Sequence, residues 1–197
     1  MPRVVPGYKK QARETIMDSA SQLFFELGYH GTGMDDIASK IGVTKGTLYL
    51  YFRSKEELLI ETCRRNMLLL EDNLNNTISN DFMDSVEKFF KEELKMPDYI
   101  KFHWIFALGE IKSNQYVHKI LTDSYRKYIE ILFNKIEELK SRGEIPKEAD
   151  SQSLSKMLIA FHNGILVSMM QGLDENDAIS IFKAGITNIL NGSSLVK

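Results

Sequence analysis

Apolar residues recur at intervals of three and four along most of the chain, the spacing that places them on one side of an α-helix. We find no sustained alternation of polar and apolar residues, which is the pattern of a half-buried strand. The pattern therefore predicts an all-α fold. The predicted helices cover about residues 9–27, 34–41, 44–52, 55–74, 82–95, 98–111, 114–142, 151–171 and 175–190. Glycines able to end a helix follow several of them, among them Gly28, Gly42, Gly143 and Gly172.

The segment 34–52 holds two short predicted helices joined by a turn at Gly42 and Val43, which is the spacing of a helix-turn-helix. A capping pattern begins at Ser54 and predicts that a long helix starts at Lys55. The expected domains are a three-helix DNA-binding domain at 1–55 and a helical domain at 56–197. The apolar residues expected to be buried between the short helices are Ile37, Ala38, Ile41, Val43, Leu48 and Phe52.

The opposite face of the second short helix carries groups that duplex DNA could use. Lys45 and Thr47 lie in its first turn, where a lysine can donate to guanine and a threonine can contact a base or a phosphate. Gly46 lets the backbone approach the duplex without a side chain in between. Asp35 and Asp36 would repel phosphates, so we expect both to turn away from DNA.

Residues flanking this turn extend the predicted interface. Tyr49 and Tyr51 offer hydroxyl donors to phosphates, and Thr32 can donate another such bond. Lys55 lies in the first turn of the next helix, where free amide groups already favour an anion. Spacing alone fits core packing of such a helix pair equally well.

Charge is distributed unevenly along the chain, whose net charge is -2. Residues 1–55 carry eight Lys and Arg against five Asp and Glu, so the basic part is the N-terminal one. The single cysteine, Cys63, excludes an internal disulfide and a cysteine zinc site, and we expect neither a metal nor another cofactor. Apolar runs are too short to cross a bilayer, so we expect a cytoplasmic protein without membrane contact.

Eleven of the twenty aromatic residues lie between Phe82 and Phe133, and this enrichment favours a ligand cavity in the C-terminal domain. Core packing explains most of these residues one by one. The polar tips of Trp, Tyr and His could orient a mostly apolar effector. The predicted effector-binding residues are Phe102, Trp104, Tyr125, Tyr128, Phe161 and His162.

The helix predicted at 151–171 is apolar on nearly all sides, so it must be covered on two of them. Small residues spaced by four would let another helix approach it closely. One side can pack on the chain's own core and the other on the last two helices of a second copy, as a four-helix interface. The predicted interface residues are Ala160, Gly164, Ser168, Ala184 and Gly185.

Five short segments form one ordered pattern: 28–32 (Gly-Tyr-His-Gly-Thr), 36–38 (Asp-Ile-Ala), 41–43 (Ile-Gly-Val), 46–49 (Gly-Thr-Leu-Tyr) and 51–59 (Tyr-Phe-Arg-Ser-Lys-Glu-Glu-Leu-Leu). Through these segments, residues 11–60 resemble the TetR (AcrR-like) family of transcriptional regulators. The resemblance implies a homodimer that reads operator DNA with the helix pair and binds a small effector in the C-terminal domain. It places the DNA contacts on Thr44, Lys45, Gly46, Thr47, Tyr49, Tyr51 and Lys55.

We therefore predict a sequence-specific, homodimeric repressor that a small, largely apolar effector releases from its operator. The alternative is a DNA-associated protein of the same fold whose C-terminal domain binds a protein partner. An enzyme is not expected, because we find no nucleophile with a base and no paired carboxylates.

Overall fold

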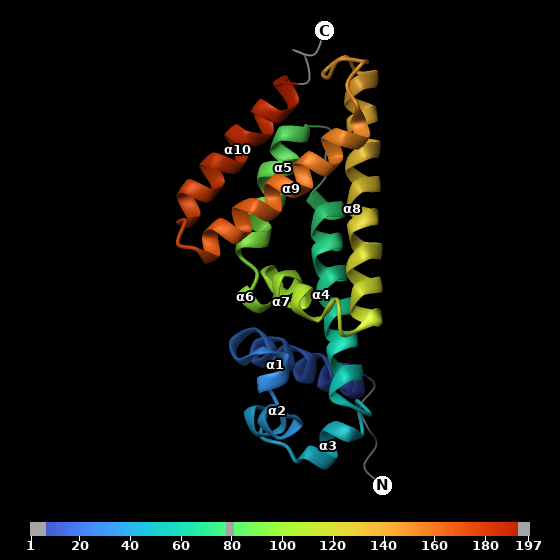
Figure 1. Cartoon of the computed structure of the whole chain (residues 1–197), viewed down its shortest axis with the longest axis vertical. Coiled ribbons are helices and arrows are strands. Elements are labelled where there is room, and N and C mark those ends of the chain that lie inside the picture. Colours follow the sequence, from blue (N-terminus) through green and yellow to red (C-terminus); the bar gives the residue numbers. More distant parts are fainter. Residues whose placement is uncertain (1–6, 78–80, 193–197) are drawn as a thin grey trace. The chain divides into compact units, whose positions relative to one another are not determined.

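The computed structural model describes residues 7–77 and 81–192, which form ten α-helices and no strand (Figure 1). The predicted all-α class is confirmed. The helix bounds are α1 Tyr8–Gly31, α2 Met34–Lys40, α3 Lys45–Tyr49, α4 Lys55–Thr77, α5 Phe82–Leu94, α6 Asp98–Lys101, α7 His103–Glu110, α8 Gln115–Ser141, α9 Ser151–Met170 and α10 Glu175–Gly192.

The predicted glycine stops adopt left-handed backbone angles, with φ of 72° at Gly42, 77° at Gly143 and 110° at Gly172. Gly28 has φ 76° and ψ 161° and kinks α1, which then continues to Gly31. The single helix predicted at 98–111 is wrong. It divides into α6 and α7 at Phe102, whose φ of -103° and ψ of 5° leave the helical region.

The helices pack as two compact units. Unit 1 consists of Met1–Leu69 and Pro97–Leu121, and unit 2 of Leu70–Met96 and Thr122–Lys197. The predicted functional boundary at residue 55 is therefore not the boundary between the packing units. The first turns of α4 and the helices α6 and α7 belong with the N-terminal helices.

Unit 1 has one hydrophobic core in which α1, α2, α3 and α4 meet. Phe24, Ile37, Leu48 and Phe52 are at most 1% exposed. Complete burial of such a side chain contributes about 1.5–3 kcal/mol, so this core holds the short helices in place. One expectation was wrong: Val43 is 37% exposed, because it lies beside the turn glycine Gly42 at the edge of the core.

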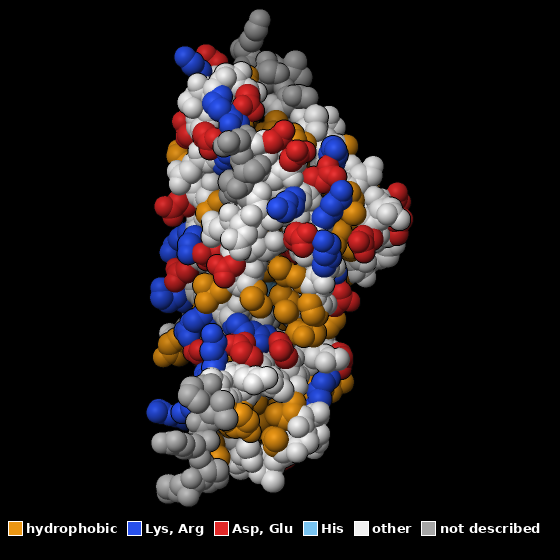
Figure 2. Space-filling model, turned by 180° about the vertical axis from the view of Figure 1, so that it is seen from behind, with side chains coloured by type: hydrophobic (Ala, Val, Ile, Leu, Met, Phe, Trp, Pro, Cys, Tyr) orange, Lys and Arg blue, Asp and Glu red, His pale blue; other side chains and the backbone are white. Residues whose placement is uncertain are grey.

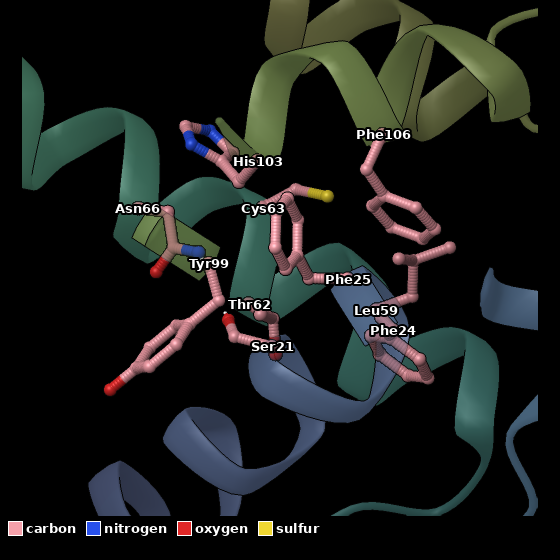
Figure 3. A pocket seen from close by; sticks show the side chains of 10 residues that line it. All are labelled: Ser21, Phe24, Phe25, Leu59, Thr62, Cys63, Asn66, Tyr99, His103 and Phe106. Atoms are coloured by element: carbon pink, nitrogen blue, oxygen red, sulfur yellow. Dashed lines mark hydrogen bonds between the residues drawn. The ribbon is translucent and has the colours of Figure 1, made fainter. Parts of the chain in front are cut away.

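A small cavity of about 10 Å³ lies within unit 1, with side chains from α1, α4, α6 and α7 around it (Figure 3). Two buried polar atoms, Thr62 Oγ1 and His103 Nε2, have no hydrogen-bond partner among the described residues. His103 Nδ1 lies 2.6 Å from the Ile100 carbonyl oxygen. Burial is the main reason why the pKa of His103 is lowered to about 4. The lining residues are Ser21, Phe24, Phe25, Leu59, Thr62, Cys63, Asn66, Tyr99, His103 and Phe106.

In unit 2, α10 packs against α9 and α5. The rings of Phe90 and Phe182 stack with centroids 4.2 Å apart. Glu87 on α5 pairs with Lys183 on α10 at 2.7 Å and with Lys91 at 2.6 Å. Hydrogen bonds from these two lysines lower the pKa of Glu87 to about 2.

Charged side chains of both signs are interspersed over the face shown in Figure 2. Within residues 7–77 and 81–192, no helix is long and apolar enough to cross a membrane. The same part of the chain contains no group of three or more His, Cys, Asp and Glu side chains that could hold a metal ion.

Candidate nucleic-acid interface

Local capping bonds define the two short helices. At the start of α2, the Gly33 amide donates to the Asp36 carboxylate at 2.6 Å. The turn at Gly42 is closed by the Val43 amide, which donates to the Ala38 carbonyl at 3.0 Å. Thr44 caps α3, since its hydroxyl accepts from the Thr47 amide at 3.2 Å. These bonds explain why α3 begins at Lys45.

The helix α3 buries one face and exposes the other. Leu48 and, just beyond the helix, Phe52 are completely buried. Tyr49 is 45% exposed and Leu50 is 78% exposed, and Thr44, Lys45 and Gly46 are exposed as well. Thr47 and Tyr51 are half-buried. The unit thus presents the predicted contact residues from Thr44 to Tyr49 on its own surface, as a reading helix requires.

Lys45 is paired within unit 1. Its Nζ lies 2.7 Å from Asp35 Oδ2, which belongs to the first turn of α2. The hydrogen bond that Lys45 donates to Asp35, followed by the charge of Asp35, raises the pKa of Lys45 above the ordinary value. Of the two acids expected to turn away from DNA, the Asp36 carboxylate accepts from the Gly33 amide and the Asp35 carboxylate faces Lys45.

Arg13 on α1 supports the end of α3, a role that the sequence did not indicate. Its Nη1 donates to the Tyr51 carbonyl at 2.6 Å, and its guanidinium lies 4.2 Å from the centre of the Phe52 ring. Its Nη2 is 4.0 Å from a Glu61 carboxylate oxygen on α4. One side chain therefore connects α1, the end of the reading segment and α4.

Two predicted phosphate donors have partners inside unit 1. Thr32 is 1% exposed, and its hydroxyl lies 3.1 Å from the Leu23 carbonyl and 2.9 Å from the Gly28 carbonyl. Lys55 Nζ donates at 2.9 Å to the carbonyls of both Tyr29 and Thr32 and lies 4.2 Å from the centre of the Tyr29 ring. Lys55 thereby joins the start of α4 to the end of α1, whereas the Thr32 hydroxyl binds two carbonyls within α1.

The predicted effector residues divide between the units. Phe102 and Trp104 belong to unit 1, whereas Tyr125, Tyr128, Phe161 and His162 belong to unit 2. Phe102 is buried and its ring stacks on that of Phe25, with centroids 6.3 Å apart. Tyr125 is 43% exposed.

A buried acid and base meet in unit 2. His162 Nε2 lies 2.6 Å from a carboxylate oxygen of Glu93, which is 1% exposed. Burial lowers the pKa of His162, but the charge and hydrogen bond of Glu93 outweigh it and raise that pKa above its ordinary value. The phenol of Tyr128 is also mostly buried, and burial raises its pKa, as does the charge of Glu93. Sequence reasoning missed Glu93, because 69 positions separate it from His162.

Four of the five predicted interface residues lie on accessible parts of α9 and α10. Ala160, Gly164 and Ala184 are exposed, and the Ser168 hydroxyl donates to the Gly164 carbonyl at 2.9 Å on the outer surface of α9. Gly185 differs: a Cβ atom added there would lie 2.0 Å from Cζ of Phe161 in the same chain. Its small size accommodates that ring.

Comparisons with known proteins agree with this architecture. Residues 16–62 match the family model for bacterial regulatory proteins of the tetR family. The chain is 28% identical over 163 residues to the biofilm operon icaADBC HTH-type negative transcriptional regulator IcaR of Staphylococcus aureus (strain Newman), an alignment that covers 80% of this chain and 73% of IcaR.

Two solved structures share the fold. One is a putative transcriptional regulator from Saccharomonospora viridis in complex with choline (TM-score 0.75, 22% identity, 92% of this chain and 96% of that one). The other is the regulator FadR from Bacillus subtilis in complex with stearoyl-CoA (TM-score 0.72, 22% identity, 91% and 98%). IcaR and FadR are both transcriptional regulators, which is the class predicted for this chain. The helix-turn-helix, α2 and α3, thus lies within the segment at residues 16–62 that matches the model for bacterial regulatory proteins of the tetR family.

Proposed function

We propose that the protein is a cytoplasmic, homodimeric repressor that reads an operator with α3 and is released by a small, largely apolar effector. The observation that carries this proposal is the two-sided character of α3. Its inner face is fixed by Leu48 and Phe52, and its outer face exposes Lys45, Gly46 and Tyr49. A rigid helix with an exposed first turn suits insertion into a major groove.

The outer face offers complementary chemistry to DNA. Lys45 can donate to guanine O6 and N7, and the hydroxyls of Thr44 and Thr47 can donate to phosphates or base edges. In the free protein these two hydroxyls lie 2.9 Å apart and bind each other at the surface. Both can exchange this bond for one to DNA. A Cβ atom added at Gly46 would lie near Thr44 Oγ1. Because glycine lacks this atom, no side chain separates the helix backbone from the DNA at this position.

Dimerisation through α9 and α10 rests on the side chains that these helices expose. Met157 and Met170 are each 49% exposed, Val167 37% and Ile181 44%, beside the small residues Ala160, Gly164 and Ala184. Exposed apolar side chains of this number on two neighbouring helices favour association with a second copy. Two identical reading helices could then occupy successive major grooves, roughly 34–36 Å apart.

The effector proposal rests on unit 2. The rings of Phe89, Phe90 and Phe182 lie 5.5, 6.0 and 5.9 Å from that of His162, and Phe161 stacks on Phe182 at 6.1 Å. An aromatic cluster around one buried polar pair suits a largely apolar molecule with a single polar group. A ligand that prefers the released conformation by roughly 1–3 kcal/mol would weaken operator binding about 5- to 150-fold.

In vitro selection tests the function. The full chain is incubated with a random duplex library, and bound sequences are recovered over several rounds. We expect enrichment of two inverted half-sites, because a two-fold dimer presents two identical reading helices. In the matched variant Gly164→Leu, the added Cβ has no atom of a neighbouring element within 4 Å, and the side chain is expected to block the proposed interface. This variant should select single half-sites and sediment as a monomer.

Two results would contradict the proposal. Recovery of no common sequence by the wild-type chain would argue against operator reading. Inverted half-sites selected by a dimeric Gly164→Leu variant would argue against the proposed interface while leaving DNA reading intact.

A further inference from the structure

We propose that Asp35 competes with DNA for Lys45 and thereby suppresses binding to sequences that lack the operator. This inference rests on the proposed DNA-reading function. It gives a role to a residue that sequence reasoning placed away from the interface. Asp35 would act on specificity through Lys45, as a positioning residue that need not touch DNA itself.

The geometry joins the two short helices through this pair. Asp35 lies in the first turn of α2, and Lys45 is the first residue of α3. The Asp35 carboxylate is 2.7 Å from Lys45 Nζ, and the side chains are 70% and 47% exposed. An ion pair that is open to solvent on both sides is weak enough to exchange its partner. The lysine can therefore leave the carboxylate when a better acceptor is offered.

The two neighbouring acids, Asp35 and Asp36, have different partners. Asp36 is occupied by the backbone amide of Gly33 at 2.6 Å and serves the start of α2. The Asp35 carboxylate pairs with Lys45 instead, and the capping box of α2 uses Gly33 and Asp36. Substitution of Asp35 should therefore leave the fold of α2 intact, whereas substitution of Asp36 would not.

The consequence differs between two kinds of DNA. A non-specific duplex offers Lys45 only phosphates, so the exchange leaves the Asp35 carboxylate unpaired beside a polyanion. An operator also offers base-edge acceptors in a fixed geometry, which compensate for the lost pair. Asp35 should therefore disfavour non-specific binding more strongly than operator binding, and so increase the ratio between the two affinities.

The dependence of DNA affinity on salt concentration gives a second, independent prediction. When Lys45 leaves Asp35 for a phosphate, the DNA releases a cation but the freed carboxylate takes one up. In Asp35→Asn no carboxylate is freed. The slope of log affinity against log salt concentration should therefore become steeper by up to about one for each reading head.

The test measures the affinity of the full chain for a mixed-sequence duplex three helical turns long, about 30 base pairs. Asp35→Asn should bind it about 3- to 10-fold more tightly than the wild type for each reading head, with the steeper salt slope. Its affinity for the selected operator should rise less. The matched control Glu148→Gln makes the same charge change at an exposed position of unit 2 and should leave both affinities unchanged.

A double-mutant cycle shows whether Asp35 acts through Lys45. In a Lys45→Ala background, the effect of Asp35→Asn should largely disappear. An undiminished effect there, or an unchanged affinity and slope in Asp35→Asn alone, would overturn the inference while leaving the proposed function standing. If the wild-type chain binds neither duplex, both the inference and the proposed function fail.

Discussion

Phe52→Ala is expected to destabilise unit 1 by about 3–5 kcal/mol, which is the usual cost of truncating a buried phenylalanine. Phe52 is completely buried within the core of unit 1, and the Arg13 guanidinium lies 4.2 Å from the centre of its ring. Its loss would leave a cavity under the end of α3 and remove the surface on which Arg13 rests. Urea unfolding followed by circular dichroism measures the change.

Leu50→Ala is the matched control, because it removes an apolar side chain from the same segment at a position that is 78% exposed. Its unfolding midpoint should stay close to that of the wild type, within about 0.5 kcal/mol in stability. An equal loss in both variants, or no loss in Phe52→Ala, would mean that α3 is not held by the core as described.

His103 is expected to make the protein acid-sensitive between pH 6.5 and about 4. Burial, followed by the charge of Arg65, lowers the pKa of His103 to about 4, although the bond to the Ile100 carbonyl opposes this shift. In that pH window the unfolded chain takes up a proton at His103 and the folded chain does not. The free energy of unfolding therefore falls as the pH falls, by roughly 3 kcal/mol across the window.

Urea unfolding of the wild type and His103→Asn at a series of pH values isolates this contribution. The asparagine amide can still donate to the Ile100 carbonyl but does not titrate. His162 acts in the opposite direction, since its raised pKa gives stability that is lost as the pH rises through that value. His162 is present in both proteins, so its contribution cancels in the difference. Parallel pH dependences for the two proteins would contradict the assignment to His103.

The helices were predictable because their signals are local. Gly28, Gly42, Gly143 and Gly172 marked bends or ends that the backbone angles bear out. The spacing of Leu48 and Phe52 gave the buried face of α3, since residues four apart share one side of a helix. The break at Phe102 carried no such signal, because neither a glycine nor a proline stands there.

The contacts around the site could not be predicted, because they join residues far apart in the chain. Arg13 binds the Tyr51 carbonyl across 38 positions, and Lys55 binds the Tyr29 carbonyl across 26. Sequence reasoning identified Lys55 as a basic residue at a helix start but could not know that two carbonyl groups occupy its amine. The same holds for Gly185, whose small size accommodates the ring of Phe161 from the neighbouring helix.

The salt dependence of operator binding by Lys45→Ala tests most directly whether the outer face of α3 reads DNA. We expect affinity for the selected operator to fall about 5- to 150-fold, and the salt slope to decrease by less than about one for each reading head, because the Asp35 carboxylate freed in the wild type takes up part of a cation. The thermal unfolding midpoint should stay unchanged, because Lys45 is exposed and its ion pair with Asp35 lies at the surface. Wild-type affinity and an unchanged salt slope in this variant would contradict the assignment of α3 as the reading helix.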